Sequence, residues 1–477
     1  MSFEPQSLDS AARRIIVAIV ATALLSGCAA GPDYRPKSAE ALGVPERYTA
    51  GARDEAPAEL TGWWSQFDDA ALTRLIDRAI EANLDIAQAV ARLRQSRAAL
   101  VQSRADLLPS LDASASGGRN VDNRQKDSSS FSAGANASWA IDLFGGTRRS
   151  IEASKADLQA AGYDLASVRT AIIAEVAVNY VDLRESQARL GIARDVLETQ
   201  QENYQIAGWR VQAGLVSSLD VEQARTQLAQ TRATVPVLET AVAAAQNRLA
   251  VLTGVAPGAL NDELAMIAPI PVGPAEIAAG IPADTLRRRP DVRASERALA
   301  AATARIELAQ AQLLPALNIS GNVGTSALST GGLGDIITGG LFATLSQFIF
   351  DGGRRLAAVR GQRAAAEGAF AAYRQSVLNA LEDVENGLVA LRSAGARQAA
   401  LGDAFESASN AAILARSQYR AGLTDFQTLL DAERQLLSAR DSLASAKADQ
   451  ATALIQLYLA LGGGWDPLAP LPDGKQP

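Results

Sequence analysis

Histidine is missing from this chain of 477 residues, and cysteine occurs once, at Cys28. Without imidazole there can be no Ser-His-Asp or Cys-His catalysis and no zinc site that depends on histidine ligands. The single cysteine lies beside the N-terminal apolar run, so thiolate chemistry elsewhere is excluded as well. Enzymes that use carboxylates alone remain open, but the sequence gives little sign of the cleft they need. We therefore expect a protein that is not an enzyme and binds no metal.

A surplus of positive charge is missing too. Lys and Arg total 45 against 52 for Asp and Glu, which gives a formal net charge of −7. Proteins that bind nucleic acids usually carry a basic patch for the phosphates. We therefore expect no nucleic-acid partner. The phosphate-binding pattern G-x-x-x-x-G-K-[ST] is also absent.

Long apolar runs are scarce, and the one from Ile15 to Leu25 follows Arg13 and Arg14. A membrane-spanning helix needs ~20 apolar residues, so we interpret residues 1–27 as a cleaved export signal. The letters L-S-G-C before and at Cys28 resemble the bacterial lipobox, whose cysteine becomes the first mature residue and carries lipid. A covalent lipid (palmitate) on Cys28 is therefore the only non-protein group expected. The alternative is an ordinary secretory signal followed by an unrelated cysteine.

The remaining chain is a tandem repeat with a period near 207 residues, far longer than a solenoid repeat. Landmarks of the first half recur in the same order in the second: Leu107-Leu108-Pro109 as Leu313-Leu314-Pro315, Gly145-Gly146 as Gly352-Gly353, Ala213-Gly214-Leu215 as Ala421-Gly422-Leu423, and Gly254 as Gly462.

Each copy contains a long stretch without proline, from Pro109 to Pro236 and from Pro315 to Pro467. These stretches are rich in helix-forming residues, and apolar residues from Val377 to Leu391 step by 4, 3, 4 and 3. This spacing predicts long helices packed as coiled coils. The alternative is several shorter core helices. Pro236 is expected to bend or interrupt its helix.

Between the helical stretches the apolar period changes to two. Leu111, Ala113 and Ala115 alternate with polar residues, and so does the segment from Phe131 to Ile141. The second copy repeats this pattern at about 316–351. Strands of about ten residues are long enough to cross an outer membrane when tilted. Two hairpins cannot close a barrel, so in lipid several chains would have to share one.

These features together resemble the outer membrane factor family, the TolC-like channels, and within it the NodT-type efflux lipoproteins. The resemblance covers the mature chain almost completely. It is carried by Cys28 and the Gly31–Pro36 stretch, Trp63-Trp64, the segment LRRRPDVRASERALAAATARIELAQAQLLP from Leu286 to Pro315, Tyr419 to Leu423, and Leu429 to Ala432.

The resemblance implies a mainly helical chain with a membrane β part. Three chains would form a homotrimer, with four strands from each closing a twelve-stranded barrel in the outer membrane lipid. Their long helices would continue as a hollow α-barrel through the periplasm. The implied partners are a periplasmic adaptor (membrane fusion) protein and an inner-membrane transporter of the proton-driven RND type, which supplies the energy.

The expected organisation follows from the repeat and the resemblance. The segments are 1–27 (signal), 28–64 (lipid-anchored segment), 65–254 (first repeat, with a strand hairpin at about 110–144), 255–282 (linker), 283–463 (second repeat) and 464–477 (tail).

In the resembling channels, an aspartate one or two turns past the second Ala-Gly-Leu lines the closed constriction, and Asp431 matches it. A neighbouring position, leucine in some relatives, is Gln427 here. A ring of carboxylates on a three-fold axis repels itself and attracts cations. The alternative is that Asp431 pairs structurally, for example with Arg434 three residues on.

The turns of the two expected helical hairpins are the periplasmic tips. They contain Gly214 and Leu215 in the first copy and Gly422 and Leu423 in the second, with glycine suited to a tight turn. Asp220 is a weaker gate candidate, and we expect it to be a helix N-cap.

Two other clusters have both a binding and a structural interpretation. The run from Arg287 to Asp291 has the composition of an anion site, but a helix start with paired arginines is favoured. Trp63, Trp64 and Phe67 are expected to pack against helices rather than bind a ligand.

The predicted function is passive conduction through the outer-membrane exit duct of a tripartite efflux pump. Two alternatives remain: the outer-membrane channel of a type I protein secretion system, and an outer-membrane coiled-coil scaffold without a pore.

Overall fold

The computed structural model describes residues 34–50, 60–121, 128–275 and 277–467. Cys28 and the expected signal lie outside the described residues. The chain divides into two compact units. We call one the strand unit, comprising residues 34–36, Leu93–Ala161 and Ala294–Tyr373. The other, the hairpin unit, comprises the described residues within 37–92, 162–293 and 374–467.

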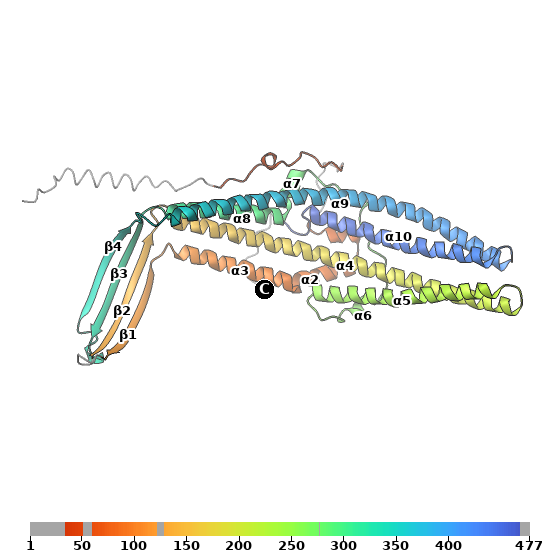
Figure 1. Ribbon diagram of the computed structural model, residues 1–477, viewed down its shortest axis with the longest axis horizontal. Coiled ribbons are helices and arrows are strands. Elements are labelled where there is room, and N and C mark those ends of the chain that lie inside the picture. Colours follow the sequence, from red (N-terminus) through yellow and green to blue (C-terminus); the bar gives the residue numbers. More distant parts are fainter. Residues whose placement is uncertain (1–33, 51–59, 122–127, 276, 468–477) are drawn as a thin grey trace, which may run out of the picture. The chain divides into compact units, whose positions relative to one another are not determined.

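The strand unit contains one antiparallel sheet with the order β1-β2-β3-β4 (Figure 1). Each repeat contributes one hairpin, so β2 and β3 pair although the helices α4 to α8 separate them in the sequence. In the described chain, β1 and β4 each have one side without a partner strand. The strands are β1 (Ser110–Asn120), β2 (Ser128–Ile141), β3 (Ala316–Ala327) and β4 (Ile337–Ser346).

The register of the sheet reproduces the alternation in the sequence. Leu111 lies opposite Ala137, and Asp112 opposite Asn136, so apolar and polar residues gather on opposite faces. The same separation continues across β3 and β4, where Ile319 lies opposite Ala343. The sheet therefore has one face of mainly apolar residues and one of mainly serine, asparagine, threonine and glycine, on which Phe342 is a large apolar exception.

Two very long helices confirm the coiled-coil prediction over the alternative of short helices. α4 (Gly146–Gln212) and α9 (Arg354–Arg420) each have 67 residues, or ~100 Å at 1.5 Å per residue. Within the strand unit α4 packs on α8 (Pro290–Ala311) through small side chains, including Ala156, Ala300 and Ala301. None of the described helices is both long enough and apolar enough to cross a membrane.

The hairpin unit is built around two helical hairpins. α5 (Ser218–Leu252) lies beside α4, and α10 (Phe426–Ala460) lies beside α9 (Figure 1). Pro236 is expected to bend or interrupt its helix, and the interruption is ruled out because α5 continues through it. Shorter elements complete the fold: α2 (Ala70–Ala82), α3 (Leu84–Ala105), α6 (Asn261–Leu264), α7 (Pro282–Arg288), η1 (Glu40–Leu42), η2 (Trp63–Phe67) and, in the strand unit, η3 (Thr330–Gly332).

Aromatic residues of η2 lie in the core of the hairpin unit. Trp63 is 1% exposed, and its ring stacks on Tyr458 of α10 at a centroid distance of 5.3 Å. Phe67 is also buried and contacts Trp63 edge to face. Trp63 and Phe67 therefore pack this segment against the helices.

Candidate functional site at the helical hairpin turns

The two hairpins of the hairpin unit end in turns of the same construction. Gly214 follows α4 with φ +70°, and Gly422 follows α9 with φ +73°. In the first turn, Leu215 N–H donates to Arg210 C=O at 2.8 Å and Gly214 N–H to Val211 C=O at 3.0 Å. The second turn repeats both bonds. This is the Schellman ending, in which a left-handed residue stops the helix and glycine avoids a Cβ penalty.

The helices that follow the turns start on different caps. Ser217 caps α5 by accepting a hydrogen bond from Leu219 N–H, so the expectation that Asp220 is the N-cap is wrong. Asp220 lies in the first turn of α5 instead, where a negative charge suits the helix dipole. In the second hairpin Asp425 caps α10. Hydrogen bonds from the side chain and backbone of Thr428 lower the pKa of the Asp425 carboxyl.

Both turns present an exposed leucine, and apolar contacts join the hairpins just behind them. Leu215 is 72% exposed and Leu423 is 78% exposed. Tyr419 packs on Phe426 at a centroid distance of 5.7 Å. The guanidinium of Arg210 lies 4.3 Å from the Tyr419 ring and donates to the Tyr419 carbonyl at 3.2 Å. The α4 end of one hairpin is thereby tied to the α9 end of the other.

A buried carboxylate, Glu433 of α10, connects three helices near the turns. Asn203 of α4 donates to both of its oxygens at 3.0 and 2.8 Å, and Arg416 of α9 pairs with it at 3.3 Å. The sequence analysis missed this residue. Its signal was the spacing of Phe426, Leu429, Leu430 and Glu433, which places an acid in the apolar stripe of α10.

The predicted constriction residues Asp431 and Gln427 lie one turn apart on α10. The Gln427 amide donates to both carboxylate oxygens of Asp431 at 3.0 and 3.1 Å. Arg434 pairs with the same carboxylate at 3.6 Å, as in the structural alternative. About half of the Asp431 side chain is nevertheless exposed, at 52%. Arg434 is shared with the first hairpin, since its Nε donates to Gln227 of α5 at 2.6 Å.

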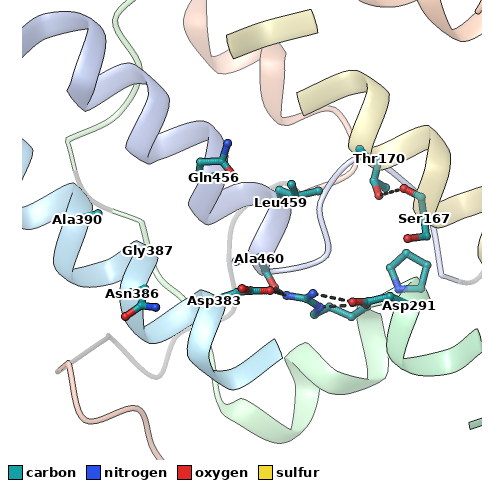
Figure 2. A pocket seen from close by; sticks show the side chains of 13 residues that line it. Ser167, Thr170, Asp291, Asp383, Asn386, Gly387, Ala390, Gln456, Leu459 and Ala460 are labelled. Atoms are coloured by element: carbon teal, nitrogen blue, oxygen red, sulfur yellow. Dashed lines mark hydrogen bonds and ion pairs between the residues drawn. The ribbon is translucent and has the colours of Figure 1, made fainter. Parts of the chain in front are cut away.

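A pocket of about 460 Å³ in the hairpin unit is lined in part by Arg289, Pro290 and Asp291, the end of the arginine-rich run. Figure 2 shows Asp291 of α8 and Asp383 of α9 among the residues that line this pocket, near Ala460 at the end of α10. The Arg289 guanidinium donates to Asp291 at 2.6 Å, to Asp383 at 2.8 Å and to the Ala460 carbonyl at 3.3 Å.

In this arrangement the Arg289 guanidinium is already paired within the protein, with Asp291 and Asp383. Burial alone would lower the pKa of Arg289, but its hydrogen bonds to Asp291 and Asp383 outweigh that effect and raise it. Pro290 occupies the first position of α8, as predicted for a helix start. Because Arg289 already has two carboxylate partners, we interpret the run from Arg287 to Asp291 as a structural junction and not as an anion site.

Comparisons with known proteins match both halves of the chain. The profile described as "Outer membrane efflux protein" matches residues 75–255 and 281–463. Nodulation protein T of Rhizobium leguminosarum bv. trifolii is 32% identical over 454 residues, covering 94% of this chain and 96% of the relative. The probable efflux pump outer membrane protein TtgC of Pseudomonas putida is 31% identical over 460 residues, covering 93% and 94%.

Among solved structures, the outer-membrane channel OprN matches with a TM-score of 0.83 and 35% identity. The match covers 92% of this chain and 100% of the OprN chain. The open-state MtrE channel of Neisseria gonorrhoeae matches with a TM-score of 0.79 and 28% identity, covering 92% and 99%.

Proposed function

The chain belongs to the outer membrane efflux protein family, and on this premise we propose that three copies form the exit duct of an efflux pump. Membership makes it an outer-membrane efflux channel and a transport protein rather than an enzyme. The trimer, the gate and the partners below are our proposals.

The observation that carries the proposal is the sheet with two unpaired edges. Unpaired backbone N–H and C=O groups cost several kcal/mol each in lipid, so only closed sheets are stable there. In an antiparallel sheet of four strands, β1 and β4 run in opposite directions. The β4 edge of one copy can therefore pair with the β1 edge of the next in the same antiparallel pattern. Three copies give twelve strands with every edge paired.

The two faces of the sheet support the same assembly. The strands have 10 to 14 residues, which is long enough for the ~9–11 residues that a tilted strand needs to cross a bilayer. In membrane barrels apolar side chains face lipid and polar ones face the lumen. The apolar face of Leu111 and Ile319 would thus meet lipid, and the polar face would line a water-filled pore.

We propose that the paired hairpin turns close this duct at rest. Around a three-fold axis, the three Asp431 carboxylates lie at one height, repel one another and attract cations. The bonds from Gln427 and Arg434 hold each carboxylate on its own helix. Opening then requires the α9–α10 hairpin to move away from the axis.

The proposed partners are those of a tripartite pump. A periplasmic adaptor would dock at the turns, where the exposed side chains of Leu215 and Leu423 offer apolar contacts. An inner-membrane transporter of the proton-driven RND type would supply the energy. The outer membrane holds the strands and, through the lipid proposed on Cys28, the N-terminus.

The test is native mass in detergent followed by planar-bilayer recording. We expect a trimer whose low resting conductance rises at least severalfold in Asp431→Ala. Asp220→Ala is the matched control, because it removes a carboxylate from the other hairpin, and it should leave conductance unchanged. A stable monomer would refute the shared barrel. A trimer that never conducts, even with Asp431→Ala, would favour the scaffold alternative.

A further inference from the structure

The polar face of the sheet carries almost no charge. Of the described strand residues, only Asp112 and Arg119 are charged at neutral pH. Both lie on β1, but seven residues apart, so they point to opposite faces. Arg119 shares its face with Leu111 and Ala113, close to the loop end of the strand. Among the described strand residues, Asp112 is therefore the single formal charge on a face that otherwise consists mainly of serine, asparagine, threonine and glycine, with Phe342 of β4 as its large apolar residue.

Asp112 belongs to a row of polar groups that crosses the whole sheet. The pairing register runs from Asp112 to Asn136, from Asn136 to Asn322, and from Asn322 to Gly340. The Asn136 amide donates to the Asp112 carboxylate at 3.1 Å. This bond fixes the carboxylate over the polar face while leaving it exposed to solvent. No cation on the described strands shares that face and neutralises it.

We propose that Asp112 sets the charge selectivity of the strand-lined part of the pore and favours cationic over anionic solutes. The proposal rests on the proposed function, because it needs three copies around one axis. Under three-fold symmetry the three Asp112 carboxylates lie at one height, whatever the tilt of the strands. They form a negative ring near the end of β1 that follows α3.

The ring acts through its field and does not block the pore. Neighbouring copies of Asp112 are four strands apart, or ~19 Å along the wall at ~4.8 Å per strand. The field of a charge decays over a Debye length of ~8 Å at 0.15 M salt but reaches much further, over ~30 Å, at 0.01 M. At high salt only solutes that pass close to the wall would therefore sense the carboxylates. At low salt the field spans the lumen, and cation preference should rise steeply.

The first experiment measures the K⁺ to Cl⁻ permeability ratio from reversal potentials of purified trimers in planar bilayers. All variants carry Asp431→Asn, so that the carboxylates at the turns do not set the result. At 0.01 M salt screening is weak, because the Debye length is ~30 Å, and we expect Asp112→Asn to lower the permeability ratio about two-fold or more. Asp112→Lys should invert the preference. Ser114→Asn, an uncharged change on the same face, is the control and should leave the ratio unchanged.

The second experiment tests the orientation of Asp112 without needing conduction. Asp112→Cys and Ala113→Cys are compared for labelling by a membrane-impermeant, hydrophilic maleimide in intact trimers. Asp112→Cys should be labelled and Ala113→Cys protected, because the two neighbours face lumen and lipid respectively. A conducting trimer whose ratio is unaffected by Asp112→Lys, or the reverse labelling pattern, would overturn the proposal. If no variant conducts, the proposed function fails, and labelling still decides the face of Asp112.

Discussion

At the scale of single residues, Glu433 shows how one carboxylate can hold the hairpins together. It is 9% exposed and bonds to Asn203 and Arg416, which come from α4 and α9. A buried acid is stable only when its oxygens are paired, and removing it leaves its partners unsatisfied. The cost therefore falls on the contact between the two hairpins.

Glu433→Ala should loosen the paired turns, with ~1–3 kcal/mol lost for each buried partner left without an acceptor. We expect faster hydrogen exchange in the α9–α10 turn and a higher open probability in bilayers. The control is Asp441→Ala, which breaks another contact between α10 and α4. Its pair with Arg189 is partly exposed and is worth only ~0–1 kcal/mol. Equal exchange rates in the two variants would refute a special role for Glu433.

Buried tyrosines of the hairpin unit make its stability sensitive to high pH. Burial raises the pKa of Tyr458 to about 12. Burial, together with the hydrogen bond to Asp69, likewise raises the pKa of Tyr180 to about 12, against 10.0 for an ordinary tyrosine. The folded state thus holds these protons more tightly than the unfolded state. Their contribution is complete below pH 10 and is lost as the pH rises towards about 12.

Tyr458→Phe should therefore flatten the loss of stability between pH 10 and about 12. Thermal melts across this range measure the effect, and tyrosinate absorbance follows the titration itself. Tyr204→Phe, which alters a less buried tyrosine of the same unit, is the control. If Tyr458→Phe and the parent lost stability in parallel, the buried hydroxyl would not be the group responsible.

At the scale of elements, the two repeats use different side chains to connect the corresponding helices: in each, a residue between two helices donates a hydrogen bond to a carbonyl at the end of a third. In the first, Asn83 between α2 and α3 donates to the Leu252 carbonyl at the end of α5, at 2.8 Å. In the second, Arg289 between α7 and α8 reaches the Ala460 carbonyl at the end of α10. Leu252 and Ala460 are 208 residues apart, the offset of the repeat. Of these two side chains only Arg289 also forms ion pairs, and its pair with Asp383 connects the second junction to α9.

Arg289→Ala should accordingly destabilise the hairpin unit, since hydrogen bonds to charged groups contribute ~1.5–3 kcal/mol each. The matched control is Arg287→Ala in the same run. Arg287 pairs with Asp284 on the surface, at 76% and 57% exposure, which predicts ~0–1 kcal/mol. Chemical denaturation of both variants measures the difference. Similar midpoints would mean that the Arg289 junction adds no stability.

The elements were largely predictable because their periods are written in the sequence. The alternation around Leu111 predicts strands, and the steps from Val377 predict a long coiled-coil helix. Prediction failed where the outcome depends on three-dimensional context. Ser217 and Asp220 are both good caps, and only the backbone conformation selects Ser217. Pro236 cannot donate a backbone hydrogen bond, yet the 35-residue helix α5 continues through it and is not interrupted.

The candidate site was predictable only in part, for a related reason. Gly214 and Gly422 were found because a tight turn between helices requires glycine. The hydrogen bonds to Glu433 were missed because the donors, Asn203 and Arg416, lie 230 and 17 residues away in the sequence. Such a set becomes visible only once α4, α9 and α10 are packed together.

At the scale of the whole molecule, the proposed trimer requires a monomer with two open sheet edges to find two others before it is stable in lipid. Its β1 and β4 edges would otherwise expose unpaired backbone groups or pair with the wrong chain. Confining the chains to one membrane surface raises their effective concentration for one another, as a tether does. A lipid on Cys28 would provide that confinement before the strands insert.

Cys28→Ala should therefore lower the yield of trimer in the outer membrane severalfold while leaving the conductance of assembled trimers unchanged. In the proposed assembly, lipid attachment would act on the search for partners, whereas the closed strands would set the pore. The measurements are native mass of outer-membrane extracts and single-channel recording of the purified trimer fraction. Ala29→Ser, which keeps Cys28 and its proposed lipid, is the control. If conductance fell as far as yield, the lipid would be part of the working channel and not only of its assembly.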